Sequence, residues 1–450
     1  MSKQSEFNSR VGVILAAAGS AVGLGNIWKF PYMVGENGGG AFLLVYVACC
    51  ILIGLPLMVT EFSIGKRTGR GLAFAFRELA GNNHWQWLGV LGALIAFLLL
   101  GFYTVVTGWC LEYLWQSCLN TFHGMTTGDL ESYFATYTSS NYRPIIWSAI
   151  ALASTATISW MGVQGGIERM SKLLMPLLLV ILVLLIGRAF MMPGCDEGMR
   201  FLFRPDFSKI TPSVLLNAMG QSFFSLSLGM GILVTYGSYM PKTQNLVATS
   251  AQVTVLDTAV AILAGVAIFP AVFAMGVAPT EGPKLVFVIL PTVFDQMSLG
   301  ALWSVLFFTL ISMAAITSVL ALLEATISYV TDRWKLERNK TILLVCSLLF
   351  VFMVLSSLSI TGHFDALCPF GMSFFDILDN LTSKILMPIC ALGILIFIGW
   401  RIPRKNTQDE LLTRSAGKYK NLVFDIYFFL IRYILPLIIL LIFLNGFGIV

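Results

Sequence analysis

The chain has 450 residues, of which 57% are hydrophobic and 11% are charged, and its mean hydropathy is +0.84. Soluble domains carry about 25% charged residues, so this composition excludes a soluble globular protein and indicates an integral membrane protein. The net charge of +5 is small and the lysines and arginines are scattered through the predicted loops, which gives little support for a nucleic-acid partner.

Eleven long apolar runs predict membrane-spanning helices, because lipid cannot satisfy exposed backbone polar groups. In chain order, the predicted spans are 11–32, 39–66, 86–119, 144–160, 168–190, 213–238, 247–275, 301–331, 340–360, 373–401 and 421–447. Basic residues gather mainly in the loops on one side, and the positive-inside rule places that side in the cytoplasm. We therefore expect a multi-pass protein of the cell inner (plasma) membrane with a cytoplasmic N-terminus. The short termini favour a prokaryotic cell.

Two predicted spans are rich in glycine near their middle, the first at 19–26 (GSAVGLGN) and the sixth at 225–231 (SLSLGMG). Glycine costs about 1 kcal/mol relative to alanine inside a helix, so both runs favour local unwinding. An alternative is close helix packing through small residues. The two spans are five apart, which predicts two inverted five-helix halves, spans 1–5 and 6–10. The expected organisation is one transporter domain over 1–450, with repeat one at about 11–190, repeat two at about 213–401 and an additional span at about 421–447.

Unwound backbone inside a membrane must face a cavity or a ligand. Helix N-termini there offer N–H groups to an anion, and freed carbonyls offer oxygen to a hard cation such as sodium. An amino acid needs both kinds of group, one for its carboxylate and one for its ammonium.

The run 19–32 (GSAVGLGNIWKFPY), followed by 36–42 (ENGGGAF), closely resembles the neurotransmitter:sodium symporter family. The resemblance continues through 54–57 with Glu61, through 166–176 and through 314–332, and covers nearly the whole chain. It is strongest to the bacterial amino-acid branch, close to the multi-hydrophobic amino acid transporters. The resemblance implies an all-α LeuT-like fold of about eleven transmembrane helices with broken helices 1 and 6. It also implies sodium symport by alternating access.

The resemblance also implies two all-oxygen sodium sites. The first would comprise Ala21, Asn26, Ser225 and Asp257, completed by the substrate carboxylate. The second would comprise Gly19, Val22, Ala314, Thr317 and Ser318. A Thr-Ser pair can instead bond back to carbonyls of its own helix. Eight cysteines without a C-x-x-C pair indicate neither a thiolate metal site nor a redox site, and we expect no organic cofactor.

The substrate site implied by the resemblance lies between the two broken spans. Its carboxylate would meet the amides of Gly23, Leu24 and Gly25 and the Tyr103 hydroxyl, and its ammonium would meet the carbonyls of Ala21 and Phe224 and the Ser227 side chain. The side-chain pocket would be formed by Ser20, Leu99, Phe224, Met230, Ser318 and Leu322. Because the lining carries no ionised partner, we expect a neutral hydrophobic or aromatic L-amino acid. Amine-transporting relatives have an aspartate where this chain has Gly23, which favours amino acids.

Asp257 departs from the pattern of chloride-dependent relatives, which usually have asparagine there. Those relatives bind chloride at positions like Tyr46, Gln221 and Ser225, with a serine where this chain has Ala261. The Asp257 carboxylate could supply the negative charge that chloride supplies elsewhere, so we expect chloride-independent transport. Asp257 could also take up a proton on the empty return step.

The gates follow from the same resemblance. Lys29 and Asp379 would form the outer ion pair, and Tyr103 and Phe224 the lid over the substrate. On the cytoplasmic side, Asp332 matches the family's acid.

Gln4 and Phe7 stand where arginine and tryptophan are frequent in the family, so Lys3 or Arg10 could replace the inner partner of that acid. Gly166 and Pro176 match a pattern that opens the inner water path, with a break favoured at the proline. Glu324 is a second intramembrane acid to which the sequence assigns no role.

Other classes of protein remain to be weighed. An enzyme is disfavoured because the chain has only three histidines, far apart in the sequence, and no metalloprotease or nucleophile-elbow motif. A sodium-dependent amino-acid sensor or a passive channel of the same fold is the alternative. Only a coupled carrier accumulates substrate against a gradient.

Overall fold

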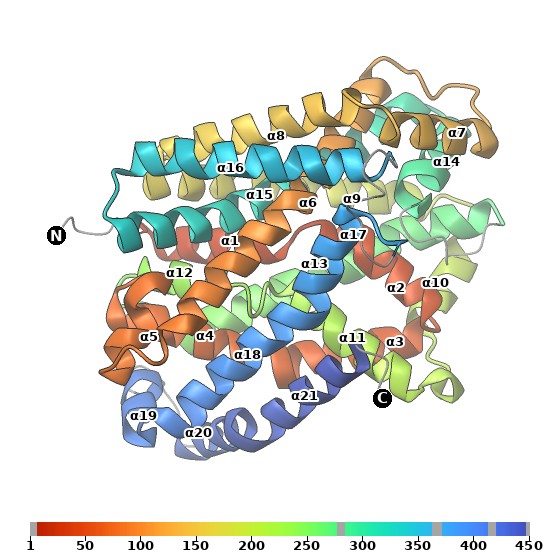
Figure 1. The fold of residues 1–450 in the computed structure, drawn as a ribbon. Helices are drawn as coiled ribbons and strands as arrows, with labels where there is room; N and C mark the ends of the chain where they lie inside the picture. Colours follow the sequence, from red (N-terminus) through yellow and green to blue (C-terminus); the bar gives the residue numbers. More distant parts are fainter. Residues whose placement is uncertain (1–6, 277–283, 362–370, 413–419, 447–450) are drawn as a thin grey trace.

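The computed structural model describes residues 7–276, 284–361, 371–412 and 420–446, and every element within these ranges is a helix. The long helices run side by side as a bundle (Figure 1). One end of the bundle carries the N-terminus and the short helices α5 (Leu72–Ala80) and α19 (Arg404–Leu412). The opposite end carries α7 (Thr127–Thr138), α10 (Cys195–Phe203) and α14 (Leu290–Asp295). We call these the inner and the outer end.

Eight continuous helical segments of the described chain are long and apolar enough to cross a membrane. They are Gly40–Thr68 (α3, η2, α4), Gln86–Cys118 (α6), Val163–Ala189 (η3, α9), Leu246–Ala274 (α13), Gly300–Trp334 (α15), Arg338–Ser359 (α16), Phe374–Arg401 (α17, η8, α18, η9) and Lys420–Leu444 (α20, η10, α21). A bent pair at the N-terminus makes a ninth. Helix α8 (Arg143–Trp160) and the interrupted pair α11–α12 fill the two remaining places among the eleven predicted spans.

The first span is broken where the sequence predicts it. Helix α1 (Arg10–Ala21) ends before the π-helical turn η1 (Gly25–Lys29), which continues into α2 (Phe30–Glu36), and the two arms bend by 49°. The sixth span is broken as well, between α11 (Pro212–Ser225) and α12 (Ile232–Ser238).

The connection between α11 and α12 contains three residues with positive φ: Ser227 at 54°, Gly229 at 71° and Gly231 at 75°. This backbone conformation favours glycine, so the two glycines explain why the helix ends here. The prediction of two unwound spans is confirmed.

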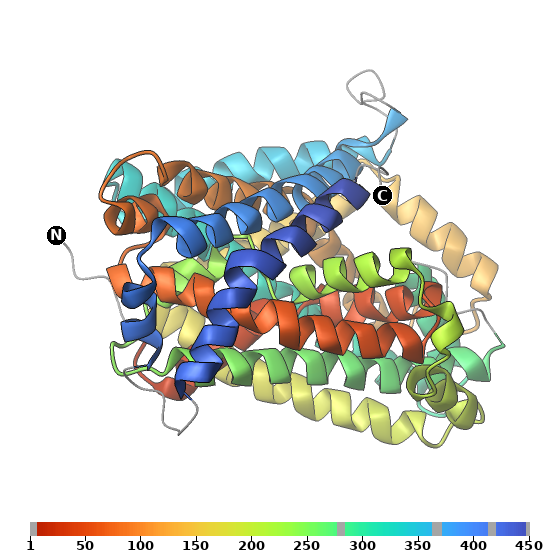
Figure 2. The same cartoon turned by 90° about the horizontal axis from the view of Figure 1, so that it is seen from below.

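The bundle places the two breaks at its centre. Helix α6 packs along α15 and α8, α4 packs on α12, and α1 lies among α9, α13 and α15. The last span lies outside this core, where α21 (Leu435–Gly446) packs on α18 (Met387–Ile396), as Figure 2 shows. The repeat boundaries predicted from the sequence stay a prediction.

Several short helices in the loops were not predicted. They are α5, α7, α10, η4 (Phe207–Lys209), η5 (Leu285–Ile289), α14 and α19. Most are too short or too polar to stand out as apolar runs, and they are held by packing on the bundle.

Candidate substrate and ion site

A cavity lies between the two broken spans, α6 and α15. It is lined by Ser20, Ala21, Gly23, Gly25, Leu99, Tyr103, Phe224, Ser227, Met230, Ile232, Ser318 and Leu322. Every residue of the predicted substrate site except Leu24 belongs to this lining. Ile232 was missed, although its place directly after Gly231 at the start of α12 puts it beside the predicted break.

Gly23 and Gly25 bring the backbone of the first break against its neighbours. A Cβ on Gly23 would lie 2.2 Å from the Ser318 hydroxyl and 2.9 Å from the Tyr103 hydroxyl. A Cβ on Gly25 would lie 3.1 Å from the Phe224 ring. A side chain at position 23 would displace these two hydroxyls, so glycine lets the backbone of the first break lie close to α6 and α15.

Polar groups in and next to the cavity wall are bonded to each other. The Leu24 amide donates to the Tyr103 hydroxyl at 3.1 Å, and the Gly23 amide donates to Asn26 Oδ1 at 3.0 Å. Across the cavity, Ser227 Oγ donates to the Ser20 carbonyl at 2.8 Å and so joins the two broken spans. A substrate carboxylate and ammonium could replace these partners at both poles of the cavity.

Three of the four residues predicted for the first sodium site are in direct contact. Asn26 Nδ2 donates to Asp257 Oδ1 at 2.8 Å and to Ser225 Oγ at 3.1 Å. Ser225 Oγ donates to Asp257 Oδ2 at 2.8 Å. Ala21 lines the cavity beside this cluster. All of these groups are buried.

The cluster leaves a charge without a counterion. Asp257 is fully buried, its hydrogen-bond partners Asn26 and Ser225 are neutral, and it forms no ion pair with any described residue. An ionised carboxylate is costly in such surroundings unless a cation joins it. Its oxygens, together with those of Asn26 and Ser225, form the hard-oxygen set that suits sodium.

The positions at which relatives bind chloride surround the same carboxylate. Tyr46 donates its hydroxyl to Ser225 Oγ at 3.0 Å, and Gln221 donates to the Gly25 carbonyl at 2.8 Å. Ala261 is buried and offers no hydroxyl. The only negative group among these neighbours is therefore Asp257 itself.

The second predicted sodium site lies between α1 and α15, which pack together. Thr317 and Ser318 donate their hydroxyls to the Ala314 carbonyl of their own helix, at 2.9 and 3.2 Å. Gly19 and Val22 belong to the end of α1, where the Val22 amide bonds back to Ala18. The residues are thus brought to the same interface, but in this state the two hydroxyls follow the alternative of bonding within their helix.

At the outer side, Lys29 lies 4.3 Å above the Phe224 ring as a cation–π pair. Asp379 accepts a hydrogen bond from Ser383 at 2.9 Å, and no ion pair within 4.0 Å joins Lys29 to Asp379, both of which the structure describes. Tyr103 and Phe224 both line the cavity, as predicted for the lid.

At the inner side, Asp332 interacts with Arg70 and accepts a hydrogen bond from the Gly71 amide. The sequence predicted Lys3 or Arg10 as the basic partner of Asp332. Lys3 lies outside the described residues, and Arg10 forms no ion pair within the described chain. Phe7, at the place of the family's tryptophan, is buried.

Phe7 contacts the inner end of α12. Its ring packs edge-on against Tyr236 and Tyr239, at 5.8 and 6.1 Å, and its amide donates to the Tyr239 carbonyl at 3.0 Å. Phe7 thus packs against the end of the sixth span.

Glu324 forms a buried ion pair that was not predicted. The Arg338 guanidinium contacts both carboxylate oxygens, at 3.0 and 2.6 Å, and also donates to the Ser159 carbonyl. Tyr239 of α12 donates to the same carboxylate at 2.8 Å. Four helices, α8, α12, α15 and α16, therefore meet at Glu324. In the sequence, Arg338 was one of several basic loop residues, and nothing singled it out.

The predicted inner-path residues lie on the fifth span. Gly166 approaches α8 so closely that a Cβ would lie 2.0 Å from the Ile158 carbonyl. Helix α9 (Arg169–Ala189) continues through Pro176, so the expected break is not seen in this state.

Beside Gly166, Glu168 accepts hydrogen bonds from the Asn8 amide and the Ser9 hydroxyl and pairs with Lys172. It thereby ties the start of α1 to this span.

Comparison with known proteins agrees with this geometry. A family model described as the sodium:neurotransmitter symporter family matches residues 4–128 and 140–448. An uncharacterised sodium-dependent transporter of Bacillus subtilis is 38% identical over 99% of this chain and 98% of its own length. One from Haemophilus influenzae is 35% identical over 99% and 98%.

Among solved structures, the crystal structure of MhsT in complex with L-phenylalanine has a TM-score of 0.90. It is 38% identical in sequence, and the match covers 98% of this chain and 100% of that one. The all-α LeuT-like fold expected from the sequence is thereby confirmed.

Proposed function

The chain belongs to the sodium:neurotransmitter symporter family, and from this premise we propose that it is a symporter of sodium and a neutral hydrophobic or aromatic L-amino acid. Sodium-dependent transport follows from the family, and the protein is not an enzyme. The proposal concerns the substrate, the number of sodium ions and the independence from chloride.

The observation that carries the proposal is the buried Asp257 beside the substrate cavity. Its carboxylate accepts hydrogen bonds from Asn26 and Ser225, and Asn26 Oδ1 accepts a hydrogen bond from the Gly23 amide at the cavity wall. A sodium ion among these oxygens would lie next to a carboxylate bound at Gly23. Each ligand would then favour the binding of the other, which is the coupling that symport needs.

The cavity supports a neutral, apolar substrate side chain. Leu99, Phe224, Met230, Ile232 and Leu322 supply its apolar surface, and none of the described residues that line it is acidic or basic. A charged side chain would lose its hydration there without gaining a partner. The bound L-phenylalanine of the MhsT structure is consistent with such a pocket.

We assign a second sodium ion to the contact between α1 and α15. Rotation of the Thr317 and Ser318 hydroxyls away from Ala314 would free three oxygens toward the end of α1. Sodium bound there would tie the broken span to α15, and its loss to the cytoplasm would favour the inward-open state. The proposed orientation places the inner end, with the N-terminus, in the cytoplasm.

Uptake by purified protein in proteoliposomes tests the proposal. Labelled leucine and tryptophan should accumulate only with an inward sodium gradient, and equally in chloride and in gluconate. Accumulation that requires chloride would support symport but contradict the proposal that Asp257 replaces chloride. Sodium-dependent binding without accumulation would favour a sensor, and flux that never exceeds equilibrium would favour a channel.

A further inference from the structure

Phe287 is a member of a buried aromatic cluster toward the outer end of the bundle. It belongs to η5 and is fully buried. Its ring stacks on Phe134 of α7 at 5.4 Å and 6°, and it also contacts Tyr113 at 5.0 Å and Trp28 at 6.4 Å. Trp28 belongs to η1, three residues after Gly25, so this aromatic cluster adjoins the substrate-binding break.

The closed cluster leaves polar atoms without partners. Trp28 Nε1, Trp109 Nε1 and the Tyr113 hydroxyl are buried and form no hydrogen bond with any described residue. Burying such groups unpaired costs free energy that is recovered when water reaches them. Other contacts must therefore compensate to keep Phe287 in place.

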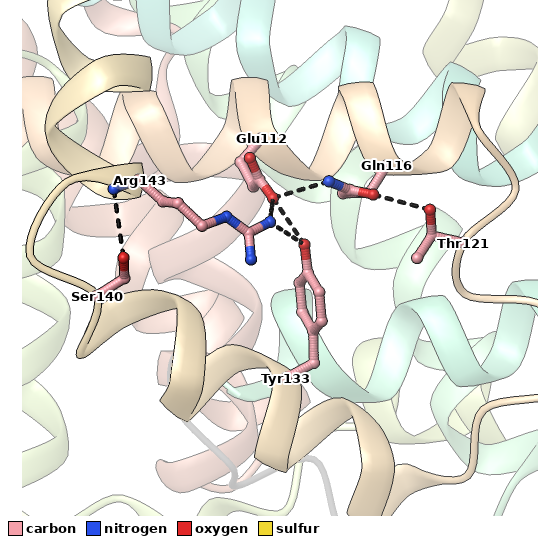
Figure 3. Close-up of polar contacts among 6 residues, drawn as sticks. All are labelled: Glu112, Gln116, Thr121, Tyr133, Ser140 and Arg143. Carbon is pink, nitrogen blue, oxygen red and sulfur yellow. Dashed lines mark hydrogen bonds and ion pairs between the residues drawn. The ribbon is translucent and has the colours of Figure 1, made fainter.

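Polar contacts link α7 to α6 and to the start of α8, as Figure 3 shows. Glu112 of α6, whose side chain is 2% exposed, is contacted through one oxygen by the Arg143 guanidinium at the start of α8. The same oxygen accepts hydrogen bonds from the Tyr133 hydroxyl at 2.7 Å and from Gln116 at 3.0 Å. We call Glu112, Tyr133 and Arg143 the outer knot.

The outer knot and the aromatic cluster meet in α7, because Tyr133 and Phe134 are adjacent in its sequence. The Tyr133 hydroxyl reaches Glu112 and also accepts a hydrogen bond from Arg143 at 3.0 Å. The Phe134 ring meets Phe287. Burial and the neighbouring Glu112 raise the pKa of Tyr133 above its usual range, so the hydroxyl keeps its proton at neutral pH.

We propose that Glu112, Tyr133 and Arg143 are positioning residues of the transport cycle. By fixing α7 between α6 and α8, they hold Phe134 against Phe287 and set how readily the outer route to the cavity reopens. A second link between α7 and the start of η5, the Glu131–Lys284 ion pair, is about half exposed and contributes little. The effect on transport rests on the proposed function, whereas the effect on Phe287 does not.

Hydrogen–deuterium exchange of purified protein in nanodiscs tests the positioning directly. Tyr133→Phe keeps the ring and removes the hydroxyl from a charged partner, so amide exchange in 285–295 should become about tenfold faster. Phe134→Leu should have a similar effect without touching the outer knot. Glu131→Gln, which removes only the exposed ion pair, is the matched control and should leave exchange in this segment unchanged.

The exchange of 387–396, in α18, reports on the rest of the fold. The proposal requires that this segment stay protected in both variants. Unchanged exchange of 285–295 in Tyr133→Phe and Phe134→Leu would overturn the proposal, and so would an equal increase in both segments.

In proteoliposomes, Tyr133→Phe and Phe134→Leu should lower the maximal uptake rate by a larger factor than they lower the affinity of sodium-dependent substrate binding. If exchange changes as expected while even the wild type shows no sodium-driven uptake, the proposed transport function fails and the role of the outer knot in holding Phe287 stands.

Discussion

Asn26 and Asp257 join the two halves of the chain, since the Asn26 amide of the first broken span donates to the Asp257 carboxylate of α13 at 2.8 Å. The same Asn26 side chain accepts a hydrogen bond from the Gly23 amide at the edge of the substrate cavity. One side chain therefore bonds to residues of both the proposed sodium site and the proposed substrate site, so under the proposed function it would couple the two.

Removing sodium should destabilise the protein, because it leaves Asp257 buried beside neutral partners only. Sodium at a hundred times its Kd would stabilise the folded state by about 2.7 kcal/mol. We expect the apparent Tm in detergent to fall by several degrees when sodium is replaced by choline. Asp257→Asn should lose most of this response, whereas Lys340→Gln, at an exposed ion pair with Glu337, should retain it. A full sodium response in Asp257→Asn would contradict the assignment.

Asp257→Asn should also change the anion dependence of uptake. With the carboxylate removed, sodium keeps the substrate carboxylate but loses its negative protein ligand unless chloride enters, so uptake in gluconate should fall at least about tenfold. The double variant Asp257→Asn/Ala261→Ser restores the hydroxyl found in chloride-binding relatives and should recover uptake in chloride alone. Labelled uptake in the two anions measures both effects. Chloride-independent uptake by Asp257→Asn would remove the proposed role.

Gly23→Ala should abolish substrate binding. The added Cβ would lie 2.2 Å from the Ser318 hydroxyl, within the space that the substrate carboxylate needs. We expect affinity to fall at least about a hundredfold in scintillation-proximity binding, since an overlap of this kind costs several kcal/mol. Gly187→Ala is the matched control, because its Cβ meets no atom within 4 Å. Binding by Gly23→Ala within threefold of the wild type would show that the carboxylate lies elsewhere.

The sequence predicted the parts of the site that depend on local backbone chemistry. Glycines at mid-span identify both breaks, and the motif around Gly23 and Asn26 identifies the residues that line them. These predictions succeed because an unwound helix in lipid has few solutions.

What the sequence could not predict depends on how distant segments meet. Arg338 and Glu324 are 14 residues apart, and only the packing of α16 on α15 aims the guanidinium at the carboxylate. Helix α7 lies in a polar loop, and its role beside Phe287 rests on the placement of Tyr133 and Phe134. Such contacts carry no motif that a single sequence reveals.

Breaking the Arg338–Glu324 pair should loosen the inner end of the bundle. Glu324 is fully buried, so Arg338→Gln leaves an unpaired carboxylate and should cost about 3–5 kcal/mol of stability. The double variant Glu324→Gln/Arg338→Gln removes the charge together with its partner and should be more stable than Arg338→Gln. Thermal unfolding of Arg338→Gln, of Glu324→Gln and of the double variant gives the coupling energy between Glu324 and Arg338.

The same pair also holds Tyr239 of α12, against which Phe7 packs. Arg338→Gln and the double variant should therefore expose the inner end. Labelling of a cysteine placed at Phe7 should become faster in each of them. Lys340→Gln, at an exposed pair, should change stability by less than about 1 kcal/mol and leave the labelling unchanged. If the double variant recovers stability but not the slow labelling, the pair serves closure of the inner end as well as stability. If neither variant alters the labelling, the pair only stabilises the fold.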